Sequence, residues 1–439
     1  MSVLVISCNF ISAASSASEL DKSVKINDPN LKVEKIWRED FKVERNDLSP
    51  VTSFQFLSTK DILLLEKNQG IVHRIHNGNM SKNTLLDVNV ANERERGLLG
   101  IDVLKNTSGD TMQVYLYFTE SKTGDGIDYC PLPMFICTES NNPIGNRLYR
   151  YDLVDNKLVN GKLMLNLPAT PGPVHNGGVI KIGPDRNIYL IIGDVVAVFS
   201  NSSYNQAQNN VNSTQVDGRS GILRITADGI PVSNDGILGD SYPLRLYYAY
   251  GIRNSFGMDF DPVTGSLWDT ENGGEYRGDE INLVKQGFNS GWNTIEGVWQ
   301  PETPQATQPS SPLNLVTFDG KGKYSAPELA LNFTVGLTDI AFLDSKMLGK
   351  QYENDLFVGD HHTGNLYHFE LSDNRSSLAL SGVLADKIAD SPNELDNVTF
   401  ATGFGRITSL EIGPDGYLYV LSHKGSEATI YRIIKATYA

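Results

Sequence analysis

Cysteine, basic residues and long apolar runs are all scarce in this sequence. Its 439 residues carry 52 Asp and Glu against 37 Lys and Arg, a formal net charge of −15 at pH 7. That balance opposes broad contact with nucleic acid or an anionic membrane surface. Beyond the first residues, no apolar run approaches the roughly 20 residues of a membrane-spanning helix. The sequence therefore predicts no membrane span and leaves small molecules as partners.

The chain has three cysteines, at positions 8, 130 and 137. If Cys8 belongs to a leader, Cys130 and Cys137 remain, and an even pair in an exported chain predicts a disulfide. Two reduced surface thiols are the alternative. A metal site at this pair is excluded because no histidine or third cysteine lies near it.

Residues 1–18 resemble a secretory leader. Short apolar stretches are followed by the small-residue tract 12–18, which is typical of the end of a signal segment. A frayed terminus is the alternative, and residues 5–8 loosely fit a lipid-attachment box. We expect a secreted or extracytoplasmic glycoprotein, either free or anchored at its N-terminus. Asn-x-Ser/Thr sequons agree with export and occur at Asn79, Asn106, Asn201, Asn212, Asn332, Asn374 and Asn397.

Helical periodicity is also scarce, whereas short β-branched and aromatic runs recur between turn residues. Six segments share a pattern of apolar-x-apolar, a turn and a second strand. In three of them the turn contains Pro and Asp, which favour tight turns. The six segments begin at Phe54, Ile101, Val179, Met258, Ile340 and Leu410.

Six such units predict an all-β, six-bladed β-propeller with four-stranded antiparallel blades. A pair of β-sandwiches is the competing architecture. We assign residues 1–18 to the leader, 19–49 to an N-terminal extension and 50–439 to the propeller. In a propeller the loops at one mouth of the central channel build the binding site.

Two motifs suggest catalysis. His175 precedes Gly177 and Gly178, where the backbone can approach a ligand closely. Asp194, at the end of the next strand, could orient the imidazole of His175 as a general base. Arg253 and Asn254 stand between glycines and could meet an anionic or quinoid ligand. A turn histidine and a surface arginine are the structural alternatives.

An oxygen-rich run extends from Glu271 to Ser290. Carboxylates, amides and backbone carbonyls are the hard ligands that calcium requires, so this run is a candidate metal site. An acidic loop without a ligand is the alternative.

The order of several motifs resembles the glucose/sorbosone dehydrogenase family from about Val51 to Ile434. These motifs are Glu95–Gly100, His175–Gly178, Ser220–Ile225, Tyr250–Asn254, Gly278–Asn282 and Gly413–Gly416. The resemblance implies a six-bladed propeller that oxidises an aldose sugar at C1 with pyrroloquinoline quinone (PQQ) and Ca²⁺. It does not indicate the sugar or the electron acceptor.

The resemblance also assigns roles to residues. His175 matches the general base, Asp194 its partner, and Arg253 and Asn254 the residues beside the quinone. The carbonyls of Gly273 and Gly274 match ligands of the cofactor's calcium. Asp279 and Glu280 match a structural calcium site. Ser290, at the end of the oxygen-rich run, is a further candidate metal ligand.

The cofactor cradle departs from the family. His362 stands where sugar-oxidising members carry a lysine, and of two expected arginines Arg406 is present while the other position is Thr408. Losing two fixed cations weakens the binding of a tricarboxylate. Two alternatives therefore stand beside the dehydrogenase: a non-catalytic binding propeller and a calcium-dependent, lactonase-like hydrolase.

Overall fold

The computed structural model describes residues 19–20, 24–42, 49–105, 111–122, 124, 144–195, 204–232, 236–274, 278–299 and 311–436. The predicted leader and both cysteines of the predicted disulfide lie outside these residues. So do the sequons at Asn106 and Asn201.

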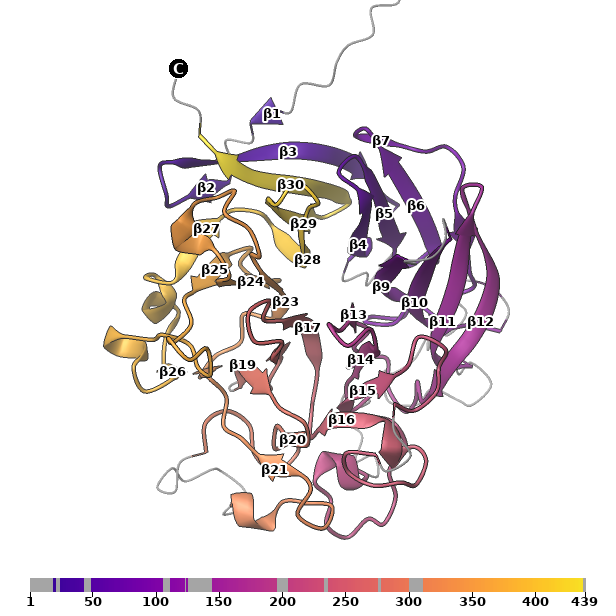
Figure 1. The fold of residues 1–439 in the computed structure, drawn as a ribbon, viewed down its shortest axis with the longest axis vertical. Helices are drawn as coiled ribbons and strands as arrows, with labels where there is room; N and C mark the ends of the chain where they lie inside the picture. The colour runs from indigo at the N-terminus through magenta and orange to yellow at the C-terminus, as the bar shows by residue number, and fades with distance from the viewer. Residues whose placement is uncertain are drawn as a thin grey trace, which may run out of the picture.

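The strands form six sheets, which Figure 1 shows arranged around a common centre. The first sheet contains β4 (Val51–Ser58), β5 (Asp61–Glu66), β6 (Ile71–His76), β7 (Asn79–Met80) and β8 (Leu86–Asp87). The second contains β9 (Leu98–Lys105), β10 (Met112–Glu120), β11 (Gly145–Val154) and β12 (Lys157–Leu167). The third contains β13 (Ile180–Ile182), β14 (Ile188–Ile192), β15 (Gly221–Ile225), β16 (Tyr247–Tyr250), β20 (Phe288–Asn289) and β21 (Lys323–Tyr324).

The other three sheets complete the circle. The fourth contains β17 (Ser255–Phe260), β18 (Leu267–Glu271), β19 (Asp279–Val284), β22 (Leu329–Leu331) and β26 (Ile388–Ala389). The fifth contains β23 (Leu337–Phe342), β24 (Leu356–Asp360), β25 (Leu366–Phe369), β27 (Thr399–Thr402) and β2 (Lys25–Ile26). The sixth contains β28 (Arg406–Ile412), β29 (Leu418–Lys424), β30 (Glu427–Lys435), β3 (Leu31–Asp40) and β1 (Glu19–Leu20).

Helix is confined to short 3-10 turns in the described part of the chain. They are η2 (Gln206–Gln208), η3 (Leu244–Leu246), η4 (Pro312–Asn314), η5 (Lys350–Tyr352), η6 (Gly382–Leu384) and η7 (Pro392–Leu395). Among the residues described, no helix is long and apolar enough to cross a membrane.

The innermost strands contact one another in a closed circle, in the order β4, β9, β13, β17, β23, β28 and back to β4. This arrangement confirms the all-β propeller and excludes a pair of β-sandwiches. The prediction of four-stranded blades is wrong in detail, because five of the six sheets add strands to an antiparallel core of four. Three of the added strands, β20, β21 and β26, pair in parallel with their neighbours.

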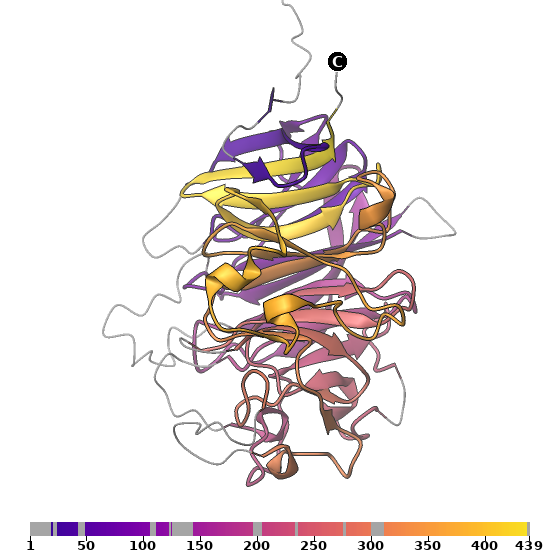
Figure 2. The same ribbon diagram turned by 90° about the vertical axis from the view of Figure 1, so that its left-hand side faces the viewer.

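The two ends of the chain close the ring. Strand β3 pairs antiparallel with β30, so a strand from the N-terminal region lies beside the C-terminal one (Figures 1 and 2). Leu31, Val33 and Trp37 of β3 are buried in the core. The boundary predicted at residue 50 is therefore wrong, because part of the assigned extension is a propeller strand.

The predicted Pro-Asp hairpins connect β13 with β14, β17 with β18, and β28 with β29. In the first turn, Asp185 Oδ1 accepts the backbone N–H of Asn187 at 3.1 Å, and Tyr189 Oη donates to Asp185 Oδ2 at 3.1 Å. In the last turn, Tyr419 donates to Asp415 at 2.9 Å in the same way. The aspartate thus fixes the turn and anchors the strand that follows it.

Apolar side chains fill the space between adjacent sheets. One cluster, for example, packs Tyr189 and Ile191 of β14 against Met258 and Leu267 of the next sheet. Each sheet therefore buries both faces against its neighbours and holds the innermost strands in place.

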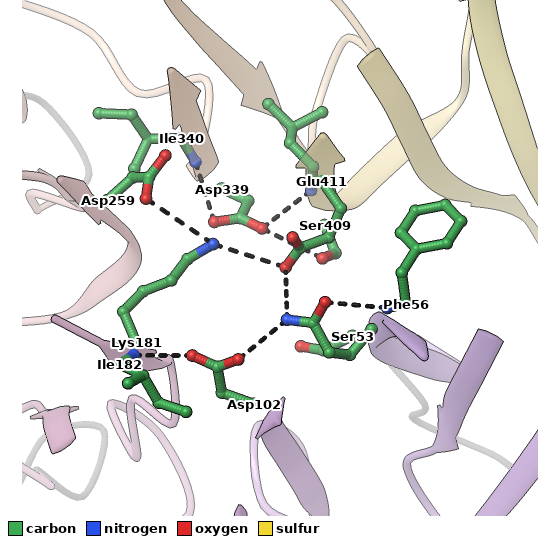
Figure 3. A network of polar contacts seen from close by, with 12 residues as sticks. Ser53, Phe56, Asp102, Lys181, Ile182, Asp259, Asp339, Ile340, Ser409 and Glu411 are labelled. Atoms are coloured by element: carbon green, nitrogen blue, oxygen red, sulfur yellow. Dashed lines mark hydrogen bonds and ion pairs between the residues drawn. The ribbon is translucent and has the colours of Figure 1, made fainter. Parts of the chain in front are cut away.

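Polar side chains from the middle of the innermost strands converge at the centre of the ring (Figure 3). We call them the axial ring; they are Gln55, Asp102, Lys181, Asp259, Asp339 and Glu411, one from each innermost strand. Lys181 Nζ lies 3.5 Å from Glu411 Oε1 and 4.0 Å from Asp259 Oδ1. Gln55 Nε2 donates to Asp102 Oδ1 at 3.1 Å and to Glu411 Oε1 at 3.4 Å.

The axial carboxylates also join neighbouring sheets. Three of them accept a backbone N–H from the next innermost strand: Asp102 from Ile182 at 2.7 Å, Asp259 from Phe342 at 2.9 Å and Asp339 from Leu410 at 2.8 Å. The same contact thus recurs between successive sheets and fixes the register of the inner strands.

Candidate active site

A cavity of about 340 Å³ lies at the other end of the innermost strands. Every sheet contributes to its lining near the start of its innermost strand: Thr52, Leu99, Val179, Phe256, Thr338 and Thr408. This volume is within the range of small-molecule and cofactor sites. We call this cavity the axial pocket.

His175 lies beside this pocket, between the lining residues Val174 and Gly177. Its Nδ1 is 2.6 Å from Asp194 Oδ1, and Asp194 is fully buried. An ionised carboxylate only accepts hydrogen bonds, so Nδ1 is the donor in this contact and Nε2 is left on the opposite side of the ring. The predicted pairing of these two residues is present, in the geometry of a base and its orienter.

The backbone around His175 explains the neighbouring glycines. His175 has a φ of 62°, in the left-handed region that few non-glycine residues adopt. Its N–H donates to Glu95 Oε2 at 2.6 Å. A Cβ on Gly193 would lie 2.5 Å from the carbonyl oxygen of Arg253 and 2.6 Å from that of His175. Only glycine fits there, and this close approach brings Asp194 next to the imidazole.

Trp292 connects the dyad to Arg253. Its indole Nε1 donates to Asp194 Oδ2 at 2.8 Å, and the Arg253 guanidinium lies 5.4 Å from its ring centroid. Both carboxylate oxygens of Asp194 are therefore engaged, which fixes its orientation. Sequence reasoning gave Trp292 no role, although it lies in the Gly-Trp pair that directly follows the oxygen-rich run.

Arg253 also binds one of the two carbonyls predicted for calcium, that of Gly273. Its Nη1 donates to the carbonyl oxygens of Asn272 at 2.8 Å and Gly273 at 2.6 Å. A calcium ion at Gly273 would have to displace this guanidinium. In this structure, therefore, Gly273 does not fit a cofactor calcium.

Asp279 and Glu280 are adjacent on β19, so their side chains point to opposite faces of the strand. The carboxylate of Asp279 accepts N–H groups of Val335 and Gly336, both at 2.8 Å, and anchors the loop before β23. Glu280 instead accepts the N–H of Gly297 at 2.6 Å. The structure therefore does not bring these two predicted ligands to one ion.

Glu280 and Ser290 do come together, with Glu271 as a third member. Glu271 and Glu280 are cross-strand partners, and Ser290 Oγ donates to Glu271 at 2.6 Å and lies 3.4 Å from Glu280. Asp269 and Asn282 form a cross-strand pair two residues along the same strands, and each has a buried Oδ1 with no hydrogen-bond partner. We call these five residues the buried oxygen cluster.

Burial dominates the electrostatics of this cluster. Desolvation raises the pKa of Glu280 to about 8 and that of Asp269 to about 7. Burial and the neighbouring Glu280 raise the pKa of Glu271 well above its usual value. Within the described chain, no three His, Cys, Asp or Glu side chains are grouped as a metal site. The amide and hydroxyl oxygens would therefore have to complete the coordination, and the orphaned oxygens fit a hard cation.

Only some of the predicted cofactor-binding residues line the axial pocket. Among the described residues that line the axial pocket, His362 and Thr408 are present, whereas Arg253, Asn254 and Arg406 are not. Asn254 lies next to the pocket, because its Nδ2 is 3.4 Å from Glu95 Oε2. Lys67 and Arg94 line the pocket as well, and sequence reasoning missed both. They lie far from His175 in the sequence. Arg94 directly precedes the Glu95–Gly100 motif, but no motif marks Lys67.

Comparison with known proteins agrees with this fold. The sequence signature described as Glucose / Sorbosone dehydrogenase matches residues 48–432. The chain belongs to this family. It is 27% identical over 209 residues to aldose sugar dehydrogenase YliI of Escherichia coli, covering 47% of this chain and 48% of the relative. It is 34% identical over 146 residues to quinoprotein glucose dehydrogenase B of Acinetobacter calcoaceticus, covering 31% of this chain and 29% of the relative.

Each of these matches thus spans half or less of the curated relative. Structural similarity covers more of the chain than these sequence matches do. The PQQ-bound aldose sugar dehydrogenase of Streptomyces coelicolor superimposes with a TM-score of 0.60 at 19% identity, covering 95% of this chain and 100% of that protein. This likeness supports the propeller architecture predicted from the sequence.

Proposed function

We propose that this protein is a PQQ-dependent aldose dehydrogenase that oxidises the sugar at C1, with His175 as general base. The observation that carries the proposal is the His175–Asp194 pair, oriented by Trp292, beside the axial pocket of a family member. The names of its relatives, aldose sugar dehydrogenase and quinoprotein glucose dehydrogenase, support the substrate class. The electron acceptor remains external to the chain.

The axial pocket fits a carboxylated quinone. Thr338 and Thr408 line it, and each has a buried hydroxyl with no hydrogen-bond partner in the described structure. Such a group costs about 1–3 kcal/mol unless a ligand satisfies it. His362 is a further lining donor, with Arg253, Asn254 and Arg406 proposed at the margin. When bound, the quinone supplies a two-electron acceptor for the hydride from C1.

The chain's own residues handle the proton. His175 Nε2, opposite the Asp194 contact, accepts the proton of the anomeric hydroxyl. Asp194 holds the ring in the required tautomer and stabilises the imidazolium that forms. The Arg253 guanidinium, which stacks on Trp292, places a fixed positive charge near the dyad.

We propose that calcium binds at Glu280, Ser290 and Glu271 of the buried oxygen cluster and stabilises the fold. Three members of the cluster are buried carboxylates, and none of its members carries a positive charge. A divalent cation bound there would offset their repulsion. Gly273 and Asp279 of the predicted set are left out, because Arg253 engages the first and the loop before β23 engages the second. Gly274 is also left out; its N–H donates to Glu296 Oε1 at 3.2 Å. Calcium should raise the melting temperature and chelation should lower it.

For the whole chain we propose export, a leader at residues 1–18, glycosylation at exposed sequons and a Cys130–Cys137 disulfide. The small-residue tract at residues 12–18 and the sequons support export. Mass spectrometry of unreduced peptides from the secreted protein would detect the disulfide, and free thiols at both cysteines would contradict it.

The decisive experiment replaces the base. In quinone-loaded protein, His175→Gln should lower kcat for aldose oxidation about a hundredfold or more, because a general base contributes roughly 10² to 10⁴ in rate. Melting temperature and quinone binding should stay near wild type. His76→Gln is the matched control, since the His76 side chain is 59% exposed on the outer part of its sheet. Full activity of His175→Gln, or a wild type that oxidises no aldose when loaded, would contradict the proposal.

A further inference from the structure

Three histidines lie close together on the side of the axial pocket that is across the ring from His175. His361 and His362 line the pocket directly after β24. The ring centroid of His361 is 5.9 Å from that of His362 and 5.9 Å from that of His423 on β29. In the closed circle of innermost strands, β28 of this last sheet stands opposite β13, the strand that follows His175. We call the three residues the histidine cluster.

The backbone fixes His361 and His362. Their N–H groups donate to the carbonyl oxygens of Gly336 at 2.9 Å and Val335 at 3.0 Å, respectively, in the loop before β23. A Cβ on Gly336 would lie 3.2 Å from Nε2 of His362, so this imidazole packs closely against the glycine. Asp279 holds the same loop by accepting the N–H groups of Val335 and Gly336. Two imidazoles therefore face the pocket from an anchored segment.

His423 differs from the other two because it is 4% exposed. Burial lowers its pKa to about 4, with the positive charge of Arg406 as a smaller cause. His423 is therefore neutral near pH 7, and its Nδ1 donates to Gly425 O at 3.2 Å because a carbonyl oxygen only accepts. The buried Nε2 has no hydrogen-bond partner in the described structure, and its lone pair favours positive charge on the adjacent His361. A proton taken up by the cluster thus goes to His361 or His362.

The charged groups around the cluster include cations on both sides of the pocket. These are Arg406, the cross-strand partner of His423, Lys424 beside it, and Lys67 and Arg94 on the lining. The carboxylates are Glu95 of the lining and Asp279 and Asp360 of β19 and β24, all of which accept backbone N–H groups. Cations oppose protonation of an imidazole, and an anionic ligand offsets their effect. Binding of an anion and uptake of a proton are therefore coupled here.

The proposed reaction decides which end of the quinone faces the cluster. The carbonyl that accepts the hydride has to lie on the side of His175, since the base acts on the same sugar carbon's hydroxyl. The carboxylates then extend across the pocket, away from Glu95, toward the cluster. Thr408 stands there with a buried hydroxyl that has no partner in the described structure and can donate to a carboxylate oxygen. Histidine supplies the positive charge only when it is protonated, and its charge ordinarily changes between pH 5 and 8.

We propose that His361 and His362 take up a proton when they bind the carboxylates of a ligand, so that retention of the ligand in the axial pocket falls as the pH rises. This inference rests on the proposed function, because it concerns the carboxylated quinone. It goes beyond that function by making cofactor loading a pH-dependent step.

Binding measurements test the inference without activity. Titration calorimetry at pH 6, 7 and 8 uses two probes, PQQ and benzene-1,2,4-tricarboxylate, whose carboxyl groups are largely ionised over this range. Repeating each titration in two buffers of different ionisation enthalpy gives the number of protons taken up. Wild type should take up protons with both probes, and its affinity should fall about tenfold or more between pH 6 and 8.

Variants assign the proton to the cluster. His361→Gln and His362→Gln should each reduce proton uptake and weaken binding more at pH 6 than at pH 8. His362→Lys should bind both probes more tightly than wild type at pH 8 and depend less on pH, since lysine stays protonated. His175→Gln should keep the pH dependence of the wild type. His76→Gln is the matched control, because its side chain is 59% exposed on another sheet.

The outcomes separate the two proposals. PQQ affinity that stays within twofold from pH 6 to 8 overturns the inference and leaves the proposed function standing. So does a pH dependence that His175→Gln abolishes and both cluster variants retain. Tricarboxylate binding with proton uptake through the cluster, without PQQ binding, supports the inference and overturns the proposed function. Binding of neither probe overturns both. If His361→Gln does not fold, the two variants of His362, whose side chain is exposed, decide the question.

Discussion

The two ends of the innermost strands carry different chemistry on the same six strands. At the pocket end, cationic side chains and two orphaned hydroxyls surround a cavity, and Arg94 and His175 adopt left-handed backbone conformations. At the axial ring, one to three residues further along, carboxylates are bound by one lysine and by backbone N–H groups. Buried polar groups without hydrogen-bond partners, together with unusual backbone conformations, indicate a ligand site. Buried polar groups whose hydrogen bonds are all made within the protein indicate structural support.

This difference predicts that ring variants change stability and pocket variants change binding or rate. The largest effect should follow from Lys181→Met. Removing the cation leaves Asp259 and Glu411 without their ion-pair partner, and breaking a buried pair costs about 3–5 kcal/mol. Denaturant unfolding should show a lower free energy, while the folded variant still binds quinone. A loss below about 1 kcal/mol would show that the ring does not depend on its lysine.

At the pocket end, Asp194→Asn should lower kcat about tenfold or more, equivalent to roughly 1.4 kcal/mol. The amide no longer fixes the tautomer of His175 or stabilises its protonated form. Steady-state kinetics of the quinone-loaded variant measures this, with Lys181→Met as the comparison from the other end. If Lys181→Met lowered kcat more than Asp194→Asn, the division between the two ends would be wrong.

The axial ring should make stability depend on pH. Burial raises the pKa of Glu411 to about 8 and that of Asp339 to about 6, while Lys181 opposes both shifts. An unfolded glutamate releases its proton near its usual value of 4.5, so the folded state binds more protons between that pH and about 8. Stability therefore falls as pH rises through this window, by at most about 1.4 kcal/mol per pH unit for one group.

Glu411→Gln removes that carboxyl group. Above the pKa of Asp339, the free energy of unfolding of this variant should therefore depend less on pH than that of the wild type. Thermal or denaturant unfolding across pH 5 to 9 measures it. A wild-type free energy that rises between pH 6 and 8 would contradict the assignment.

The smallest expected effect compares two hydroxyls. Thr338→Val at the pocket removes an orphaned hydroxyl and should leave stability unchanged or raise it by up to about 1 kcal/mol. Ser409→Ala at the ring removes the bond from Ser409 Oγ to Asp339 Oδ2, 3.1 Å long, and should cost about 1 kcal/mol. Quinone affinity should weaken in Thr338→Val, which loses a hydroxyl in the pocket. It should stay unchanged in Ser409→Ala. Equal changes in the free energy of unfolding at both positions would contradict the difference between the pocket hydroxyl and the ring hydroxyl.

The sequence by itself determined the local structure. Pro-Asp turns fixed the hairpins because Asp185 and Asp415 bond their own turns. The apolar-x-apolar segments became the innermost strands because their flanking residues pack between sheets. The glycines around His175 marked a close backbone approach, which the Gly193 contact explains.

Tertiary structure decided which of these residues meet. The middle residues of the repeats, Asp102, Asp259 and Glu411 among them, showed no shared role until closure of the ring brought them to one axis. Lys67 and Arg94 reached the pocket of His175 by the same closure. Adjacent Asp279 and Glu280 were separated because neighbours on a strand face opposite sides. Spacing along a chain fixes a side chain's face, but only packing of the sheets selects its partners.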